Sequence, residues 1–263
     1  MVKEAAARTR ERHSVQSVDR ALDLLEALAG NDGEVSITSL ANRTGLHVST
    51  AHRLLATLLR RGYVRQNPDT SRYYAGVKLA TLAEGRSRYG ELRLRARGIL
   101  RSLAESTRET ANLIVLDDTT AVYLETVPGP QMVRLFTTVG NRVPLHATGA
   151  GKALLAWLPA PRREAILARV ELRPHTGRTI SDPAALRRAI EDIRERGYSI
   201  DDEEYDDGVR CVAVPVGPLG APIAALSVSG PASRLGRSRL GELAPIVRRA
   251  ATELAEALRE RPQ

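Results

Sequence analysis

The stretch TGLHVSTAHRLLATLLRRGYV, residues 44–64, carries hydroxyl, imidazole and guanidinium groups at helical spacing. On a 3.6-residue period from about His47 to Arg60, apolar residues converge on one side and polar residues on the other. A guanidinium can donate two hydrogen bonds to one base edge, and short hydroxyl side chains suit a helix that enters a DNA groove. The predicted apolar side holds Val48, Ala51, Leu54, Leu55 and Leu58, and the predicted DNA-binding side chains are Ser49, Thr50, His52, Arg53 and Thr57.

The segments around this helix predict a winged helix-turn-helix. SVQSVDRALDLLEALAG predicts a helix, SITSLANRTG predicts a second one capped by Ser36 or Thr38, and Gly45 makes the turn into the third. Two β-favouring stretches then flank residues 67–70, which is a hairpin signal. We expect Arg65 and Arg72 of this hairpin to contact flanking phosphates. The apolar face predicted for the first helix consists of Val15, Val18, Leu22, Leu25 and Leu28.

The distribution of charge favours the same interpretation. Residues 1–100 carry 17 Lys and Arg against 10 Asp and Glu, whereas the rest of the chain carries 22 against 21. A basic segment beside a neutral one is typical of a polyanion-binding module joined to another domain. A solvated arginine-rich surface would produce the same excess, and helix pairs with a glycine turn also occur outside DNA binding. The third helix, the hairpin and the local arginines together favour DNA.

The second half of the chain predicts an α+β domain. A helical stripe from Leu92 to Leu103 is followed by a hairpin around residues 117–118, and QMVRLFTTVG predicts a further strand. GAGKALLAWLP predicts a helix that Pro159 ends, and SDPAALRRAIEDIRERG predicts a second helix. Residues 210–230 predict a hairpin turning at 217–220. We expect a flexible arm over residues 1–13, a DNA-binding domain over 14–76, a linker helix over 77–91 and the α+β domain over 92–260.

The motif HATGAGK leads into one of these helices. Backbone N–H groups of Thr148, Gly149 and Ala150 at a helix N-terminus would attract a carboxylate through unpaired donors and the helix dipole. A glycine turn packed closely against a strand explains the same residues without a ligand. The stretch is not a phosphate-binding P-loop, because His146 and Ala153 stand where that motif requires Gly and Ser or Thr.

A second group of polar residues lies on the predicted hairpin near the C-terminus. If Ser227 and Ser229 point inward, two hydroxyls enter an apolar cavity and need a polar partner, which an oxygen-bearing ligand would supply. Cys211 lies on the facing strand, although a lone cysteine is often only buried filler. The acidic run DDEEYDD predicts a solvated loop, of which Asp201 is the member expected to turn inward.

The whole chain resembles the IclR family of bacterial transcriptional regulators. The likeness extends from about Ser14 to about Pro231 through the separated blocks SVQSVDRALDLLEAL, LANRTGLHVSTAHRLLATLLRRGYV, PLHATGAGKALLAWLP, RERGYSIDDEEYDDGVRCVAVPV and AALSVSGP. It implies an N-terminal winged helix, a linker helix that helps dimerise and a GAF-like effector-binding domain. It also implies that Asp201, Cys211, Ser227 and Ser229 line the effector site. After CVAVPV, however, Gly217-Pro218 replaces the family's usual pair at the hairpin tip.

These features predict a DNA-binding regulator rather than an enzyme. A homodimer, or a dimer of dimers, would bind a pseudo-palindromic double-stranded operator and respond to a small organic acid, with no cofactor. The alternatives are an enzyme pairing Cys211 with His146, or His175 with the acidic loop, and a metal-responsive sensor using Cys211 with His146 or Asp201. Neither a G-x-S-x-G elbow nor structural zinc spacing is present. The single cysteine, the absence of a signal peptide and the lack of a long apolar run predict a cytoplasmic protein without a membrane partner.

Overall fold

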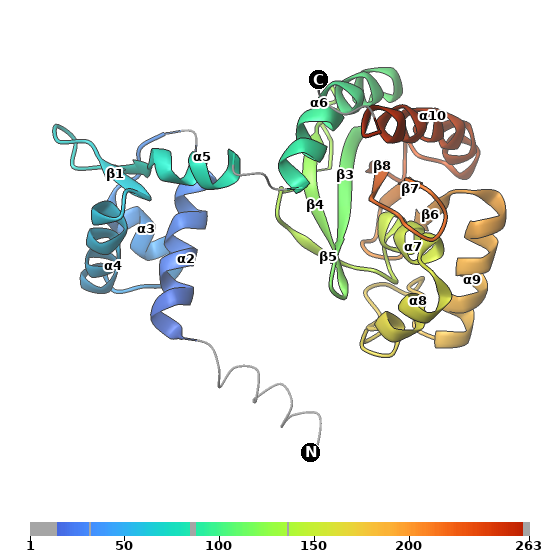
Figure 1. The fold of residues 1–263 in the computed structure, drawn as a ribbon, viewed down its shortest axis with the longest axis horizontal. Helices are drawn as coiled ribbons and strands as arrows, with labels where there is room; N and C mark the ends of the chain where they lie inside the picture. The colour runs from blue at the N-terminus through green and yellow to red at the C-terminus, as the bar shows by residue number, and fades with distance from the viewer. Residues whose placement is uncertain (1–14, 32, 85–87, 136, 260–263) are drawn as a thin grey trace, which may run out of the picture. The chain divides into compact units, whose positions relative to one another are not determined.

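The described residues form two compact units, which divide the chain between residues 87 and 88 (Figure 1). The computed structural model describes residues 15–31, 33–84, 88–135 and 137–259, so the arm expected over residues 1–13 lies outside the described residues. In place of one linker helix over 77–91, the structure has α5, Val77–Glu84, in the first unit and α6, Arg88–Thr107, in the second. Residues 85–87, between them, are outside the described residues.

The first unit is a helix-turn-helix followed by a small hairpin. Three helices pack around Leu24, Leu40 and Leu55, each of which is fully buried. Gly45 ends the second helix in the left-handed conformation, φ 65°, which lets the chain turn sharply. The elements are α2, Gln16–Ala29; α3, Ile37–Thr44; α4, Val48–Arg60; β1, Val64–Gln66; and β2, Tyr73–Ala75. The predicted element order is therefore confirmed.

The apolar face predicted for α2 is wrong at its N-terminal end. Leu24 and Leu28 face the core, whereas Val15, Val18 and Leu22 are 61%, 53% and 50% exposed. The hydrophobic period identified an apolar stripe, but it could not tell which part of that stripe the other helices of the unit cover. Val48, also predicted to be buried, is 41% exposed in the first turn of α4.

The second unit is built on one antiparallel sheet of six strands in the order β5-β4-β3-β8-β7-β6. Helices α6 and α10 cover one face, while α7 covers the other with α9 packed against it (Figure 1). The elements after α6 are β3, Thr110–Asp117; β4, Thr120–Val127; β5, Arg142–Pro144; α7, Gly149–Trp157; α8, Ala160–Leu167; α9, Pro183–Arg196; β6, Ser199–Asp202; β7, Val209–Val216; β8, Ala224–Pro231; and α10, Arg237–Ala257. The predicted α+β class is confirmed.

Successive residues of the central strands pack into the hydrophobic cores on opposite faces of the sheet. On β3, Ala111, Leu113 and Val115 pack against α6 and α10, whereas Ile114 packs on the side of α7. This follows from the two-residue period of a strand, which sends neighbouring side chains to opposite faces. Asn112 shares its face with Ile114 and is fully buried. The α7 face therefore combines apolar packing with buried polar groups.

The structure corrects one sequence expectation for this unit, refines a second and adds a helix that was not predicted. The strand predicted in QMVRLFTTVG is absent from its described residues: the Leu135 carbonyl accepts from Thr110 Oγ1 (3.3 Å) and Thr137 Oγ1 donates to Asn112 Oδ1 (2.9 Å), so the segment crosses the sheet instead of extending its edge. The acidic run is not only a loop, because Asp201 lies on β6 and pairs with β7. An unpredicted helix, α8, starts directly after Pro159 and has Pro161 in its first turn, where the missing N–H costs nothing.

Candidate nucleic-acid interface and ligand cavity

Helix α4 has an apolar face that packs in the core and a polar face on its opposite side. Ala51 and Leu55 are fully buried and Leu58 is 8% exposed, so the orientation of the helix is set by the core. Ser49, Arg53 and Thr57 are exposed on the opposite face, as predicted. His52 is exposed too, while Thr50 is half-buried.

Local hydrogen bonds made by His47 and Thr57 order this face. His47 precedes the helix as its N-cap, and its Nδ1 accepts from the backbone N–H of Ser49 (3.4 Å) and lies 2.8 Å from Ser49 Oγ. Thr57 Oγ1 donates to the Arg53 carbonyl one turn earlier (3.2 Å). Arg53 is an exposed cation on this face, one turn before Thr57.

The hairpin carries Arg65 and Arg72, both exposed. Its tip is tied to the loop before α3 by Glu34, whose carboxylate accepts from Asn67 Nδ2 (2.6 Å) and Thr70 Oγ1 (2.7 Å). These two hydrogen bonds are the main cause of the lowered pKa of Glu34. Sequence reasoning missed Glu34, because the interaction joins residues more than thirty positions apart. The predicted DNA-contacting arginines thus lie on an ordered hairpin.

In the second unit, one cavity of about 130 Å³ lies between the sheet and the N-terminus of α7. All seven residues predicted for the effector site line it: Thr148, Gly149, Ala150, Asp201, Cys211, Ser227 and Ser229. The structure therefore brings together residues from α7, β6, β7 and β8 that are up to about eighty positions apart. The remaining lining residues, which sequence reasoning missed, are Tyr123, Leu135, Thr137, Asn141, Val143, Tyr205, Asp206 and Val209.

The start of α7 needs small residues for close packing as well as for its position on the cavity. A Cβ on Gly151 would lie 2.5 Å from Leu145 Cα, and one on Gly149 would lie 3.2 Å from Cys211 Sγ. Thr148 caps the helix: its Oγ1 accepts from the Gly151 N–H (3.2 Å) and donates to the Pro144 carbonyl (2.7 Å). The close-packed glycine turn considered for HATGAGK is thus present, and the same turn lines the cavity.

The two serines do point to one side of the sheet, but a protein group already contacts them. Asn112 Nδ2 donates to Ser229 Oγ (3.0 Å) and to Ser227 Oγ (3.3 Å), and Asn112 Oδ1 accepts from Thr137. The expectation that the serines need a ligand as partner is therefore corrected. The signal that could have identified Asn112 is its place as an amide in the apolar strand ANLIVL.

Asp201 and Cys211 face each other in the register of β6 and β7 and are both buried. Loss of hydration raises the pKa of the Asp201 carboxyl to about 7, against the weaker opposing effect of the Glu204 N–H, which donates to Asp201 Oδ1 (2.8 Å). Burial, with the nearby Asp201 charge, raises the pKa of the Cys211 thiol to about 12. At neutral pH Cys211 is therefore a thiol, which is a poor nucleophile.

Of the pairings considered for an enzyme or a metal sensor, the structure gives His146 a partner other than Cys211 and places His175 beside the acidic run. His146 Nε2 lies 2.9 Å from the Arg173 carbonyl, and its ring lies 5.8 Å from that of His175. His175 does reach the acidic segment, where its ring lies 5.1 Å from that of Tyr205. Among the described residues there is no group of three or more His, Cys, Asp or Glu side chains placed to hold a metal ion.

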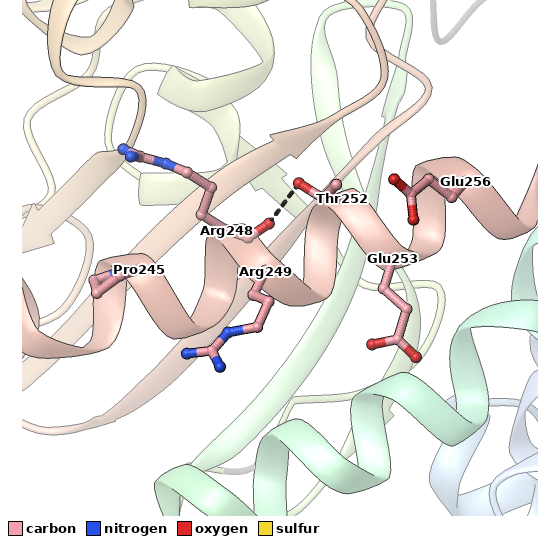
Figure 2. A pocket seen from close by; sticks show the side chains of 6 residues that line it. All are labelled: Pro245, Arg248, Arg249, Thr252, Glu253 and Glu256. Atoms are coloured by element: carbon pink, nitrogen blue, oxygen red, sulfur yellow. Dashed lines mark hydrogen bonds between the residues drawn. The ribbon is translucent and has the colours of Figure 1, made fainter.

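Figure 2 shows a second hollow, along the exposed side of α10. Arg249 and Glu253 point to one side of the helix and Arg248 and Glu256 to the other, so the charged groups do not converge on one point. Thr252 Oγ1 bonds to the backbone of Arg248, and Arg248 Nη2 donates to the Arg196 carbonyl (2.7 Å). This groove contains none of the predicted site residues, and its geometry is that of an open surface.

A helix-turn-helix with an exposed polar helix, followed in one chain by an α+β unit with a cavity lined by polar and apolar side chains, defines a DNA-binding transcriptional regulator with an effector domain. The chain matches the IclR helix-turn-helix domain over residues 17–68 and the bacterial transcriptional regulator IclR C-terminal domain over residues 88–256. It belongs to the IclR family, whose members are transcription regulators and not enzymes.

Individual relatives support the family over nearly the full chain. The acetate operon repressor of Salmonella typhimurium is 39% identical over 92% of this chain and 90% of its own length. The transcriptional repressor IclR of Escherichia coli is 37% identical over the same shares. The crystal structure of Thermotoga maritima IclR superposes with a TM-score of 0.75 at 32% identity, covering 92% of this chain and 98% of that one.

A further solved relative was crystallised with a small molecule. An IclR homologue from Microbacterium hydrocarbonoxydans, complexed with 4-hydroxybenzoate, superposes with a TM-score of 0.74 at 27% identity over 92% of this chain and 99% of that one.

No helix among the described residues is both long and apolar enough to cross a membrane.

Proposed function

We propose that this regulator reads a pseudo-palindromic operator as a homodimer or a dimer of dimers, and that a small organic acid in the Asp201 cavity changes its grip on DNA. The observation that carries the DNA half is the exposed polar face of α4, fixed by the buried Ala51 and Leu55 on its opposite side. A recognition helix needs this combination, because the core must hold the helix while its polar face stays free for base edges.

Within this proposal, each predicted residue has a role. Arg53 donates to a base edge in the major groove, while Arg65 and Arg72 on the hairpin contact phosphates. The remaining contacts come from Ser49, Thr50, His52 and Thr57. The DNA-binding part comprises residues 14–76 and the effector-binding part 92–260, and the segment between them holds α5 and the first turn of α6. The protein acts in the cytoplasm, where a bacterial operator lies.

The effector half rests on the cavity that seven predicted residues line. The N-terminus of α7 attracts an anion, and the Ser227 and Ser229 hydroxyls offer hydrogen bonds to its oxygens. The relative complexed with 4-hydroxybenzoate supports an organic acid as ligand class. Coupling between ligand and operator would amount to about 1–3 kcal/mol, the range of typical allosteric effects.

Fluorescence anisotropy with DNA from upstream of the chain's own gene tests the DNA half. Wild-type protein should form a sequence-selective complex that weakens with salt. Arg53→Ala should lower affinity about 5- to 150-fold for the operator only, the loss of a 1–3 kcal/mol base contact. The matched control is Arg188→Ala, which removes an exposed arginine from α9 in the other unit and should bind like wild type. Equal losses in both variants would contradict the assignment of α4.

A further inference from the structure

The effector cavity has an unusual charge composition for a site that binds an acid. It contains the carboxyl groups of Asp201 and Asp206, and among the described residues that line it none is basic. Asp201 is 4% exposed, so water does not screen its charge. A carboxylate entering the cavity beside an ionised Asp201 would be repelled without a cation to balance the pair.

The nearest buried cation is already committed elsewhere. The Lys152 ammonium of α7 hydrogen-bonds to both carboxylate oxygens of Glu204, and both side chains are buried. The backbone of Glu204 in turn donates to Asp201 Oδ1 (2.8 Å). Asp201 is therefore held by an uncharged backbone N–H of Glu204. The positive charge of Lys152 is balanced by the Glu204 carboxylate and not by Asp201.

We propose that the cavity binds its acid as a carboxylate together with one proton from solvent, which resides on Asp201. The Asp201 O–H then donates a hydrogen bond to one carboxylate oxygen of the ligand. The other carboxylate oxygen faces the N-terminus of α7. One ligand anion and one proton enter, so the net charge of the complex equals that of the free protein with ionised Asp201. This inference rests on the proposed effector function and specifies its ligand selection.

The other titratable groups around Asp201 do not supply this proton. Burial holds the pKa of the Cys211 thiol at about 12 and raises the pKa of the Tyr123 hydroxyl above its ordinary value, so both stay protonated near neutrality. From the loop that follows β6, Glu204 is paired with Lys152, and Tyr205 and Asp206 line the cavity. Further out, burial lowers the pKa of His146, whose ring neighbours that of His175.

The pKa of about 7 for Asp201 sets the size of the effect. An adjacent ligand carboxylate raises that pKa further, so binding takes up protons wherever free Asp201 is ionised. Uptake should rise from about 0.1 proton per ligand at pH 6 to about 0.9 at pH 8, and affinity should fall about tenfold over the same range. As pH falls toward 6 the affinity should level off, because free Asp201 is then almost fully protonated.

Isothermal titration calorimetry of the full chain measures both quantities. Acetate, lactate, pyruvate and 4-hydroxybenzoate serve as probes, each with its amide as the neutral counterpart, in phosphate and in imidazole buffer at pH 6, 7 and 8. The dependence of heat on buffer gives the number of protons taken up. Asp201→Asn should bind the acids with no uptake and with equal affinity at all three pH values, because its amide donates permanently. His175→Gln is the matched control and should retain the wild-type uptake.

Each outcome decides between the inference and the function beneath it. Binding of an acid without proton uptake, or uptake that persists in Asp201→Asn, overturns the inference and leaves effector binding intact. Binding of an amide in preference to its acid does the same. If neither acids nor amides bind at any pH, both the inference and the proposed acid effector fail, whereas operator binding by α4 is unaffected.

Discussion

Replacing Asp201 by Asn should stabilise the ligand-free effector unit, and the gain should grow with pH. The carboxyl has a pKa of about 7 in the folded unit because burial removes its hydration, against about 3.9 in an unfolded chain. The folded unit therefore holds the proton over a range where the unfolded chain has lost it, and its stability falls as pH rises from about 4 to about 7. Asn keeps an acceptor for the Glu204 N–H but carries no charge.

The free energy of unfolding of Asp201→Asn relative to wild type should rise by about 2–3 kcal/mol between pH 5 and pH 8. This value follows from the two pKa values and 1.36 kcal/mol per pKa unit. The melting temperature of the variant should exceed that of wild type by a larger margin at pH 8 than at pH 5. For a unit of this size, the margin should increase by about 5–10 °C. Differential scanning calorimetry at both pH values measures it. Asp207→Asn, which removes an exposed carboxylate from the same acidic run, should differ from wild type equally at both. A variant that is less stable than wild type at pH 8 would show that the folded protein stabilises the Asp201 charge, contrary to this reasoning.

Three further predictions concern packing, the buried ion pair and DNA. Gly151→Ala should destabilise the effector unit by about 1–3 kcal/mol in chemical denaturation, because its Cβ would overlap the Leu145 backbone; an unchanged midpoint would refute the close approach. Lys152→Met should cost about 3–5 kcal/mol by leaving the Glu204 carboxylate buried without its cation, and adding Glu204→Gln should restore much of that loss; a double variant as unstable as the single one would contradict this. Arg65→Ala should weaken operator and non-operator DNA alike and reduce the salt dependence by about one ion; a loss confined to the operator would instead indicate a base contact.

The sequence predicted the helix-turn-helix because its signals are local. Ser36 caps α3, and Gly45 adopts the turn conformation expected for it. The apolar period of α4 correctly placed Ala51 and Leu55 in the core, since a helix with one apolar stripe has one stable orientation. The same reasoning failed for Val15 and Val18, because a period reveals an apolar face without revealing whether another element of the unit covers it.

The cavity was predicted in part for a different reason. Resemblance to a family supplied Asp201 and Cys211, which only the pairing of β6 with β7 brings together. Asn112 and Tyr123 were missed because their role depends on strand order, with β3 between β4 and β8, and no local pattern encodes that order. The segment around Thr137 was misjudged as a strand, since its side-chain hydrogen bonds across the sheet are invisible to periodicity.

The two-faced sheet has a consequence for how a ligand could influence the rest of the chain. On β3, Asn112 contacts the cavity serines while its neighbours Ala111 and Leu113 press against the layer formed by α6 and α10. If a bound anion shifted that strand, Ala111 and Leu113 would move with Asn112, because adjacent residues share one peptide unit, and the shift would reach the opposite layer directly. Within this unit, no series of intervening side chains is needed to connect the two layers, because neighbouring residues of β3 belong to opposite faces of the sheet.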